Sequence, residues 1–234
     1  MSKYVGTENL EVMANAVNYN RFLVSLIQKE SRAGELVVDY GAGIGTFARK
    51  LVDYGCNVHC IEPDTEQLAG ILASGLPAAP DLACLPADSV DFLYTLNVLE
   101  HIEDDVAALR TCYTRIRPGG RILIYVPGFQ LLYSSMDKYV GHFRRYNRTN
   151  LSEKVRMAGF KVIQSEYVDC AGYIATLLFK VFGNDRGTIN QRGLVAFDRY
   201  VFPLSRLGDR VFSGLFGKNV LLTAKRPDLL GPPS

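Results

Sequence analysis

The sequence lacks tryptophan altogether and has only three histidines among its 234 residues. Its five cysteines form no C-x-x-C pair, and an odd number cannot complete a disulfide framework, so we expect reduced thiols in a cytoplasmic compartment. Cys56 and Cys60 flank a short apolar segment and are expected to pack in the core. We therefore assign no metal ligands.

No apolar run approaches the roughly eighteen residues of a membrane-spanning helix, and the first residues lack the basic and apolar regions of a signal peptide. The formal net charge of +2 is too small to indicate a nucleic-acid-binding protein. A hydrophobic content of 48% over this length suits one globular α/β domain with additions. We expect a cytoplasmic protein without a nucleic-acid partner, and we leave peripheral membrane contact and the oligomeric state open.

A glycine-dense loop at residues 41–45 is the feature around which the chain is organised. Residues 36–40 are a short apolar, β-branched run, and the residues after the loop have helical spacing, which predicts a strand, a tight turn and a helix. Nucleotide-like ligands bind at such a turn in an open α/β sheet. A dinucleotide fingerprint would require glycine where this sequence has Thr46. Asp39 would also repel a pyrophosphate, whereas it suits an ammonium or sulfonium group.

A second acid follows about twenty residues after the first glycine, at the usual distance for a ribose-binding carboxylate. Residues 57–62 predict the next strand and end in Glu62, which can accept hydrogen bonds from both ribose hydroxyls. With this pair of acids around the loop, the chain resembles the class I S-adenosylmethionine-dependent methyltransferases. Later segments at 81–86, 91–102 and 117–127 resemble the family in the same order.

This resemblance implies S-adenosylmethionine as cofactor, with S-adenosylhomocysteine as its product, and a set of residues around it. An aromatic face can favour a sulfonium, and in this family a segment before the first strand covers the cofactor, which makes Tyr19 a candidate; a packing role is equally open for it. The implied cofactor-binding residues are Tyr19, Asp39, Gly41, Ala42, Gly43, Gly45, Glu62, Asp64, Asp81, Leu82 and Asn97.

The alternation of strands and helices predicts a doubly wound, seven-stranded Rossmann-like sheet, which in this family has the order 3-2-1-4-5-7-6. The only convincing seventh strand, at 219–226, comes some fifty residues after the sixth, so a helical insertion must separate them. We also place a short third strand after Pro80 and a helix start at Asn150, with Glu153 three residues on.

The expected organisation has four parts. They are an N-terminal helical cover at 1–30, a methyltransferase core at 31–170 and 217–227, a helical cap at 171–216 with a polar break at 183–187, and a disordered tail at 228–234.

A second polar loop, at residues 136–148, follows the fifth predicted strand. It carries Asp137 and His142 with several arginines and tyrosines, more than a connector needs. Residues 141–146, Gly-His-Phe-Arg-Arg-Tyr, resemble the Gly-His-Tyr-Arg-Arg-Tyr stretch of a methyltransferase subgroup associated with bacterial glycan and cell-surface biosynthesis; Phe143 replaces the first tyrosine. The alternative is an arginine-rich loop that forms ion pairs with neighbouring carboxylates.

Methyl transfer to a hydroxyl requires a base, and histidine changes charge near neutral pH. His59 lies within the predicted second strand and is expected to be structural. His101 follows the fourth strand, where the family more often lines the cofactor. We therefore predict His142 as the general base, with His101 and Asp137 as the other catalytic candidates.

The same loop supplies the predicted substrate-binding residues. Arg144, Arg145 and Tyr146 would orient the acceptor, because arginines suit a phosphate or carboxylate.

The sequence therefore predicts a methyltransferase, most simply an O-methyltransferase of a small-molecule, glycan or lipid-linked acceptor. Transfer to nitrogen or carbon is the alternative within enzymes. A non-catalytic cofactor-binding module that serves a partner enzyme is the alternative from another class.

Overall fold

The structure is a computed structural model that describes residues 13, 15–182 and 191–228. Three expectations lie partly or wholly outside these residues. They are the start of the N-terminal cover, the polar break at 183–187 and the tail from 229 onward.

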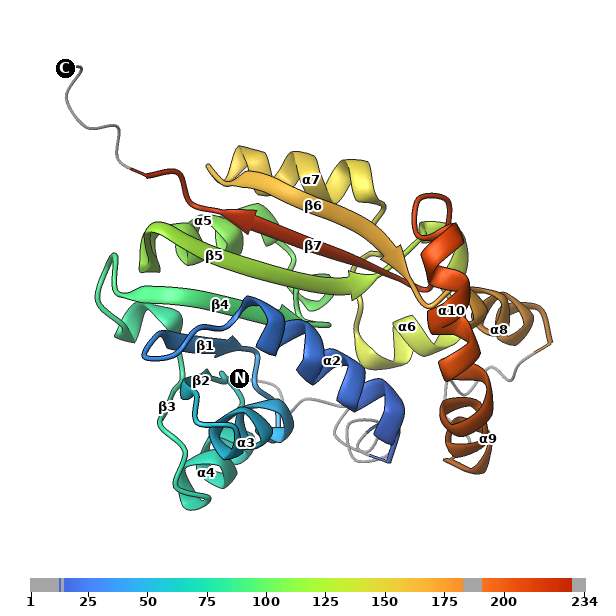
Figure 1. The fold of residues 1–234 in the computed structure, drawn as a ribbon, viewed down its shortest axis with the longest axis horizontal. Coiled ribbons are helices and arrows are strands. Elements are labelled where there is room, and N and C mark those ends of the chain that lie inside the picture. The colour runs from blue at the N-terminus through green and yellow to red at the C-terminus, as the bar shows by residue number, and fades with distance from the viewer. Residues whose placement is uncertain (1–12, 14, 183–190, 229–234) are drawn as a thin grey trace.

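Seven strands form one sheet in the order β3-β2-β1-β4-β5-β7-β6, which confirms the predicted fold (Figure 1). Strands β1 to β5 pair in parallel, and β7 runs antiparallel between β5 and β6. The strands are β1 Leu36–Tyr40, β2 Asn57–Ile61, β3 Ala78–Ala79, β4 Val90–Leu96, β5 Ile116–Pro127, β6 Lys161–Val168 and β7 Asn219–Lys225.

Helices cover both faces of the sheet because successive strand residues point to opposite sides (Figure 1). Val38 of β1 enters one apolar cluster with Leu109 of α5 and Leu151 of α7, whereas Val37 enters the other with α2, α3 and α4. These helices are α2 Val17–Glu30, α3 Thr46–Asp53, α4 Thr65–Ala73, α5 Asp105–Arg115 and α7 Arg148–Met157, and the short α6 Ser135–Val140 precedes α7.

Two predicted boundaries were wrong. The third strand lies before Pro80, at Ala78–Ala79, because Asp81 accepts a hydrogen bond from Ala83 N at 2.7 Å and starts a 3₁₀ turn. Helix α7 begins before Asn150 because Asn147 is its N-cap, and the two asparagine side chains cap each other's backbone N–H groups at 2.8 and 2.9 Å.

The predicted helical insertion separates β6 from β7 and lies beyond one edge of the sheet (Figure 1). It contains α8 Cys170–Phe182, α9 Gln191–Ala196, a π-helical turn Phe197–Val201 and α10 Phe202–Phe212. Asp209 of α10 accepts hydrogen bonds from the backbone N–H groups of Asp169 and Cys170 at 3.0 and 2.9 Å, and so caps the start of α8.

The insertion is also joined to α2. The Asp198 carboxylate accepts hydrogen bonds from the backbone N–H groups of Asn18 and Tyr19 at 2.9 and 2.8 Å, in the first turn of α2. The buried Phe202 ring packs edge-on against Tyr19, with 5.5 Å between ring centroids. A helix normally leaves its first N–H groups unpaired, so Asp198 supplies a cap that α2 lacks in its own sequence.

Among the described residues, no helix has both the length and the apolar character that crossing a bilayer demands.

Candidate active site

The carboxyl ends of five strands, β1, β2, β4, β5 and β6, meet at one edge of the sheet. Asn97, Phe129 and Asp169 shortly follow β4, β5 and β6, and their φ angles are 55°, 58° and 67° although none is glycine. Such conformations are costly and concentrate at functional sites. This edge is therefore the candidate location of the active site, as the sequence predicts for residues at strand ends.

The loop after β1 is shaped by its glycines and tied to β2. Gly41, Gly43 and Gly45 all have positive φ, and a Cβ atom on Gly41 would clash with Val98. The backbone N–H groups of Gly41 and Ala42 donate to the carbonyl of Ile61 at 2.9 and 3.1 Å. The loop is thus held open and close to the end of β2.

Glu62 links this loop to the start of α4. One carboxylate oxygen accepts from Gly43 N at 2.7 Å and the other from Asp64 N at 2.9 Å. Each oxygen keeps a further lone pair, so the carboxylate can accept two more donors, such as a ribose diol. Burial raises the pKa of Glu62, although these two N–H groups act in the opposite direction.

Asp39 lies buried at the end of β1 and its Oδ2 atom has no hydrogen-bond partner. Burial raises the pKa of this carboxyl to about 7, and the negative charge of Glu62 adds to the shift. A buried carboxylate of this kind favours a cation beside it. Asp39 and Glu62 together therefore fit a ligand that carries both an ammonium group and a sugar diol.

Tyr19 and Asn97 face each other across this edge. Burial raises the pKa of Tyr19 to about 12, while hydrogen bonds with Tyr125 and Asn97 act in the opposite direction. The backbone N–H of Asn97 donates to the carbonyl of Tyr125 at 2.7 Å. The structure therefore holds Tyr19 of α2 over the end of β4, and the same ring packs in the core with Phe202.

The remaining predicted cofactor residues lie around the same loop with local roles. Asp64 is the N-cap of α4 and accepts from two backbone N–H groups at 3.0 Å. Asp81 caps the 3₁₀ turn Leu82–Cys84, in which Leu82 is buried.

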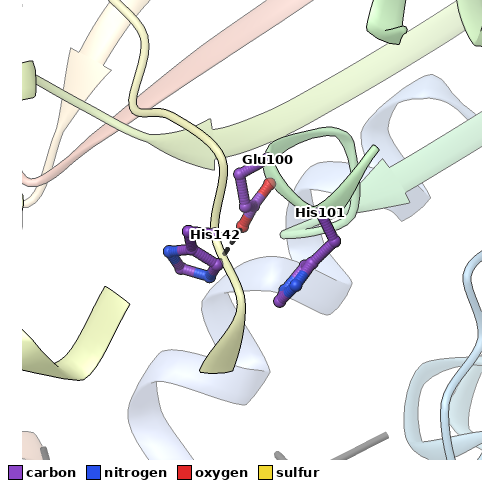
Figure 2. A group of neighbouring side chains, drawn as sticks. All are labelled: Glu100, His101 and His142. Carbon is purple, nitrogen blue, oxygen red and sulfur yellow. Dashed lines mark ion pairs between the residues drawn. The ribbon is translucent and has the colours of Figure 1, made fainter. Parts of the chain in front are cut away.

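His101 and His142, which lie far apart in the sequence, are brought together (Figure 2). Their ring centroids are 4.5 Å apart. His101 ends the 3₁₀ turn Leu99–His101 after β4, and His142 follows α6, where Gly141 with φ of 80° lets the chain turn back. The backbone N–H of Phe143 donates to the carbonyl of Glu100 at 2.8 Å, which fastens the second loop to the first.

Asp137 orients His142. Its Oδ1 atom lies 2.7 Å from Nδ1 of His142, and Arg145 donates to both carboxylate oxygens at 2.8 and 2.9 Å. Burial alone would raise the pKa of Asp137, but the hydrogen bonds from His142 and Arg145 hold it well below its ordinary value. Asp137 is therefore a permanent carboxylate partner of the imidazole.

Arg144, Arg145 and Tyr146 are held by protein groups. Arg145 is buried on Asp137, the Tyr146 hydroxyl donates to Asp105 at 2.8 Å, and Arg144 pairs with Asp105 at 2.9 Å. These contacts are the ion pairs that the sequence left open as the alternative. Arg144 keeps 26% of its side chain exposed, so an acceptor-binding role stays a prediction for it.

Glu100 was missed by the sequence analysis. It is fully buried beside the two histidines, and its Oε1 lies 3.8 Å from Nε2 of His142. Burial raises the pKa of Glu100 to about 8, and burial lowers that of His101 to about 4. The signal that could have identified Glu100 is its neighbour His101, a predicted site residue in the same turn at the sheet edge.

The chain has recognisable relatives. Residues 14–165 match a family model described as a methyltransferase domain. A ubiquinone biosynthesis O-methyltransferase of Cupriavidus pinatubonensis is 33% identical over 102 residues, which cover 39% of this chain and 41% of that protein. Phosphoethanolamine N-methyltransferase 2 of Caenorhabditis elegans is 28% identical, over 58% of this chain and 34% of that protein. The chain thus spans about two fifths or less of the length of these relatives.

Solved structures share the fold at lower identity. A SAM-dependent methyltransferase from Archaeoglobus fulgidus superposes with a TM-score of 0.60 at 17% identity, over 88% of this chain and 94% of that one. Phosphoethanolamine N-methyltransferase 2 of Haemonchus contortus, solved in complex with S-adenosyl-L-methionine, gives 0.61 at 20% identity, over 90% and 53%.

The raised pKa of Asp39 predicts a pH-dependent cost to stability. Because the folded protein binds this proton more tightly than the unfolded chain, ionisation destabilises the fold as the pH rises from about 4 to about 7. Asp39→Asn keeps the neutral form, so it should raise the free energy of unfolding at pH 8 by as much as about 4 kcal/mol. Urea unfolding at pH 4 and pH 8 measures this gain, which should nearly vanish at pH 4.

Asp53→Asn, on the exposed end of α3, is the matched control and should show no such gain. A loss of stability in Asp39→Asn at pH 8 would contradict the prediction.

Proposed function

We propose that this chain, which belongs to the methyltransferase domain family, binds S-adenosylmethionine at the loop after β1 and methylates an oxygen atom of a small-molecule, glycan or lipid-linked acceptor. The observation that carries the proposal is the pair of buried carboxylates, Asp39 and Glu62, on either side of that loop. Bound S-adenosylmethionine supplies a methyl group on a sulfonium, and the C–S bond breaks with its electron pair left on sulfur as the acceptor oxygen bonds the carbon.

The protein's own groups would hold the cofactor at three points. Glu62 accepts hydrogen bonds from the ribose hydroxyls with the lone pairs that Gly43 and Asp64 leave free. Asp39 lies where its unpartnered oxygen can pair with the ammonium group. Tyr19, on α2 above the end of β4, offers an aromatic wall to the sulfonium.

His142 is the proposed base. A hydroxyl acceptor must lose its proton as the methyl group arrives. The Asp137 carboxylate at 2.7 Å from Nδ1 fixes the ring, and Nε2 is left without a hydrogen bond to Glu100, whose Oε1 lies 3.8 Å away. A carboxylate that orients an imidazole in this way also stabilises the imidazolium that forms on proton transfer.

Transfer to nitrogen is the second candidate, because phosphoethanolamine N-methyltransferases are found among both the sequence relatives and the structural neighbours. An amine that binds in its neutral form needs no base, so the effect of removing His142 separates the two candidates.

A lipid-linked acceptor is supported by the surface of α10. Leu204, Leu207 and Val211 lie on one side of this helix and are exposed, while Phe202 and Asp209 are buried on the opposite side. Both acids in the described part of the insertion are buried, whereas four of its bases, Lys180, Arg192, Arg199 and Arg210, are exposed and the half-exposed Arg206 pairs with Asp209. An apolar stripe on a segment whose exposed charges are basic fits an anionic membrane surface, and we propose that α10 rests on one.

Replacing Glu62 should weaken cofactor binding. Charged hydrogen bonds of this kind are worth about 1.5–3 kcal/mol, so Glu62→Ala should lower S-adenosylmethionine affinity roughly tenfold to hundredfold. Calorimetric titration measures the change, and Glu153→Ala on the exposed side of α7 should bind as the unmodified protein does. Tighter binding of a nicotinamide dinucleotide than of S-adenosylmethionine would sink the cofactor assignment.

Replacing His142 should slow turnover without loosening the cofactor. If the acceptor is a hydroxyl, His142→Gln should lower kcat by roughly 10²–10⁴-fold, because proton removal is lost while positioning remains. The assay follows transfer of labelled methyl groups to extracts of candidate acceptors. Near-normal turnover, or a parallel loss of cofactor affinity, would remove His142 from the role of base.

Charges on the apolar stripe should abolish membrane binding. Leu204→Glu with Leu207→Glu should prevent flotation of the protein with vesicles that contain anionic phospholipid, because the stripe can then no longer enter the interface. Leu72→Glu, at an exposed leucine on α4, is the control and should float like the unmodified protein. Failure of the unmodified protein to float would reject the membrane proposal.

A further inference from the structure

Three side chains that the fold brings together form a compact set of potential metal ligands (Figure 2). Glu100 and His101 come from the turn after β4, and His142 comes from the loop after α6. One ligand atom from each, a carboxylate oxygen and two imidazole nitrogens, all lie within 4.8 Å of one another. The set contains two of the three histidines of the chain.

Glu100 lacks the partners that a buried carboxylate normally has. The residue is completely buried, and neither carboxylate oxygen accepts a hydrogen bond. Nε2 of His142 lies 3.8 Å from Oε1 of Glu100, which is too far for a hydrogen bond. An isolated carboxylate in an apolar environment is strongly unfavourable, so this position favours a cation in direct contact with the oxygens.

Each of the two histidine rings is oriented by a hydrogen bond to another group of the protein, as is typical of metal ligands. Nδ1 of His142 is held by Asp137 at 2.7 Å, and Asp137 is itself fixed by Arg145. The His101 ring bonds the backbone carbonyl of Val140. Metal-binding histidines characteristically donate one ring N–H to a carboxylate or a backbone carbonyl, which leaves the other nitrogen for the ion.

We propose that Glu100, His101 and His142 bind a divalent transition-metal ion of the zinc class. Two imidazoles and one carboxylate suit such an ion, whereas magnesium and calcium prefer oxygen ligands alone. Around a tetrahedral ion with bonds of about 2.1 Å, ligand atoms lie about 3.4 Å apart, so the present arrangement, with ligand atoms within 4.8 Å of one another, has to close by at most about 1.4 Å. Three protein ligands leave at least one position open, as in catalytic rather than structural sites.

The open coordination position can take the acceptor hydroxyl, and this part of the proposal rests on the proposed methyl transfer. An acceptor hydroxyl bound to the ion loses its proton more readily, since the charge of the ion stabilises the alkoxide or phenoxide. The proton passes to solvent, and the oxygen then attacks the methyl carbon as the C–S bond breaks. In this arrangement His142 serves as a ligand of the ion, and the ion replaces it in activating the hydroxyl.

Direct metal titration tests the site without any assay of activity. The unmodified protein, first treated with a chelator and dialysed, is titrated with Co²⁺, and visible absorption and calorimetry report coordination and stoichiometry. We expect one ion per chain, a higher melting temperature with Co²⁺ or Zn²⁺, and much weaker binding of Mg²⁺. Binding of neither Co²⁺ nor Zn²⁺ by the unmodified protein would overturn the proposal.

Variants then locate the bound ion. Glu100→Gln and His142→Gln should weaken Co²⁺ binding at least a hundredfold, and Asp137→Asn, which acts through His142, should weaken it about 10–100-fold. His59→Gln removes the one histidine outside the cluster and should bind as the unmodified protein does. Unchanged Co²⁺ binding in both Glu100→Gln and His142→Gln, with circular dichroism showing folded protein, would place the ion elsewhere and refute the site.

Two further measurements separate this proposal from that of methyl transfer. Cofactor affinity in the presence of chelator should stay within a fewfold of its normal value, since Glu62 and Asp39 lie outside the cluster. Turnover, where an acceptor is found, should fall with chelator and return with Zn²⁺ or Co²⁺. Turnover that is unchanged by the chelator would reject the catalytic role of the metal and leave the proposed methyl transfer standing. Co²⁺ binding without any turnover would support the metal site and count against the proposed methyl transfer.

Discussion

The carboxylate of Asp137 is the contact on which the histidine side of the site depends. It accepts hydrogen bonds from Arg145 with both oxygens, from His142, and from the backbone N–H of Ser134 at 2.9 Å. Because those groups belong to the start of α6 and to the loop that follows it, a single buried carboxylate determines the shape of the whole segment. The pKa of Asp137, held well below its ordinary value, keeps these contacts intact throughout the neutral range.

Two other buried acids at this edge, Asp39 and Glu100, differ from Asp137 because their pKa values are raised. Asp39 and Glu100 both have raised pKa values because burial is poorly compensated by protein donors. A sequence selected for stability alone would place apolar residues there, since uncompensated charge weakens the fold. Their presence beside a glycine loop and a histidine pair is the reason that we propose a cationic ligand group at Asp39 and a metal ion at Glu100.

The alternation of strands and helices and the glycine loop could be predicted from the sequence because both rest on local patterns, whereas the sheet order came from the family resemblance. Apolar runs ending in Asp39 and Glu62 mark strands whose ends must meet at one edge. The proximity of His142 to Glu100 could not be predicted from the sequence. It depends on the hydrogen bond from Phe143 N to the carbonyl of Glu100, and these two residues lie 43 positions apart in the sequence. The ion pairs of the arginines could not be predicted for a similar reason: a basic loop has the same sequence pattern whether it faces a substrate or, as Arg145 does, a buried carboxylate.

The insertion gives the fold its longest-range dependence. Asp198 and Phe202 lie about 180 residues after Tyr19, yet they supply the hydrogen-bond acceptor for the first turn of α2 and the ring against which Tyr19 packs. The position of Tyr19 over the end of β4 is therefore set from the same helical segment that carries the exposed stripe of α10. If a surface displaces α10, either α2 moves with α10 or the two hydrogen bonds to Asp198 break. Because these bonds are partly or fully buried, moving the two helices together costs less free energy than breaking the bonds. The stripe is thus connected to Tyr19, the aromatic residue that we propose faces the cofactor, through the hydrogen bonds to Asp198 and the packing of Phe202.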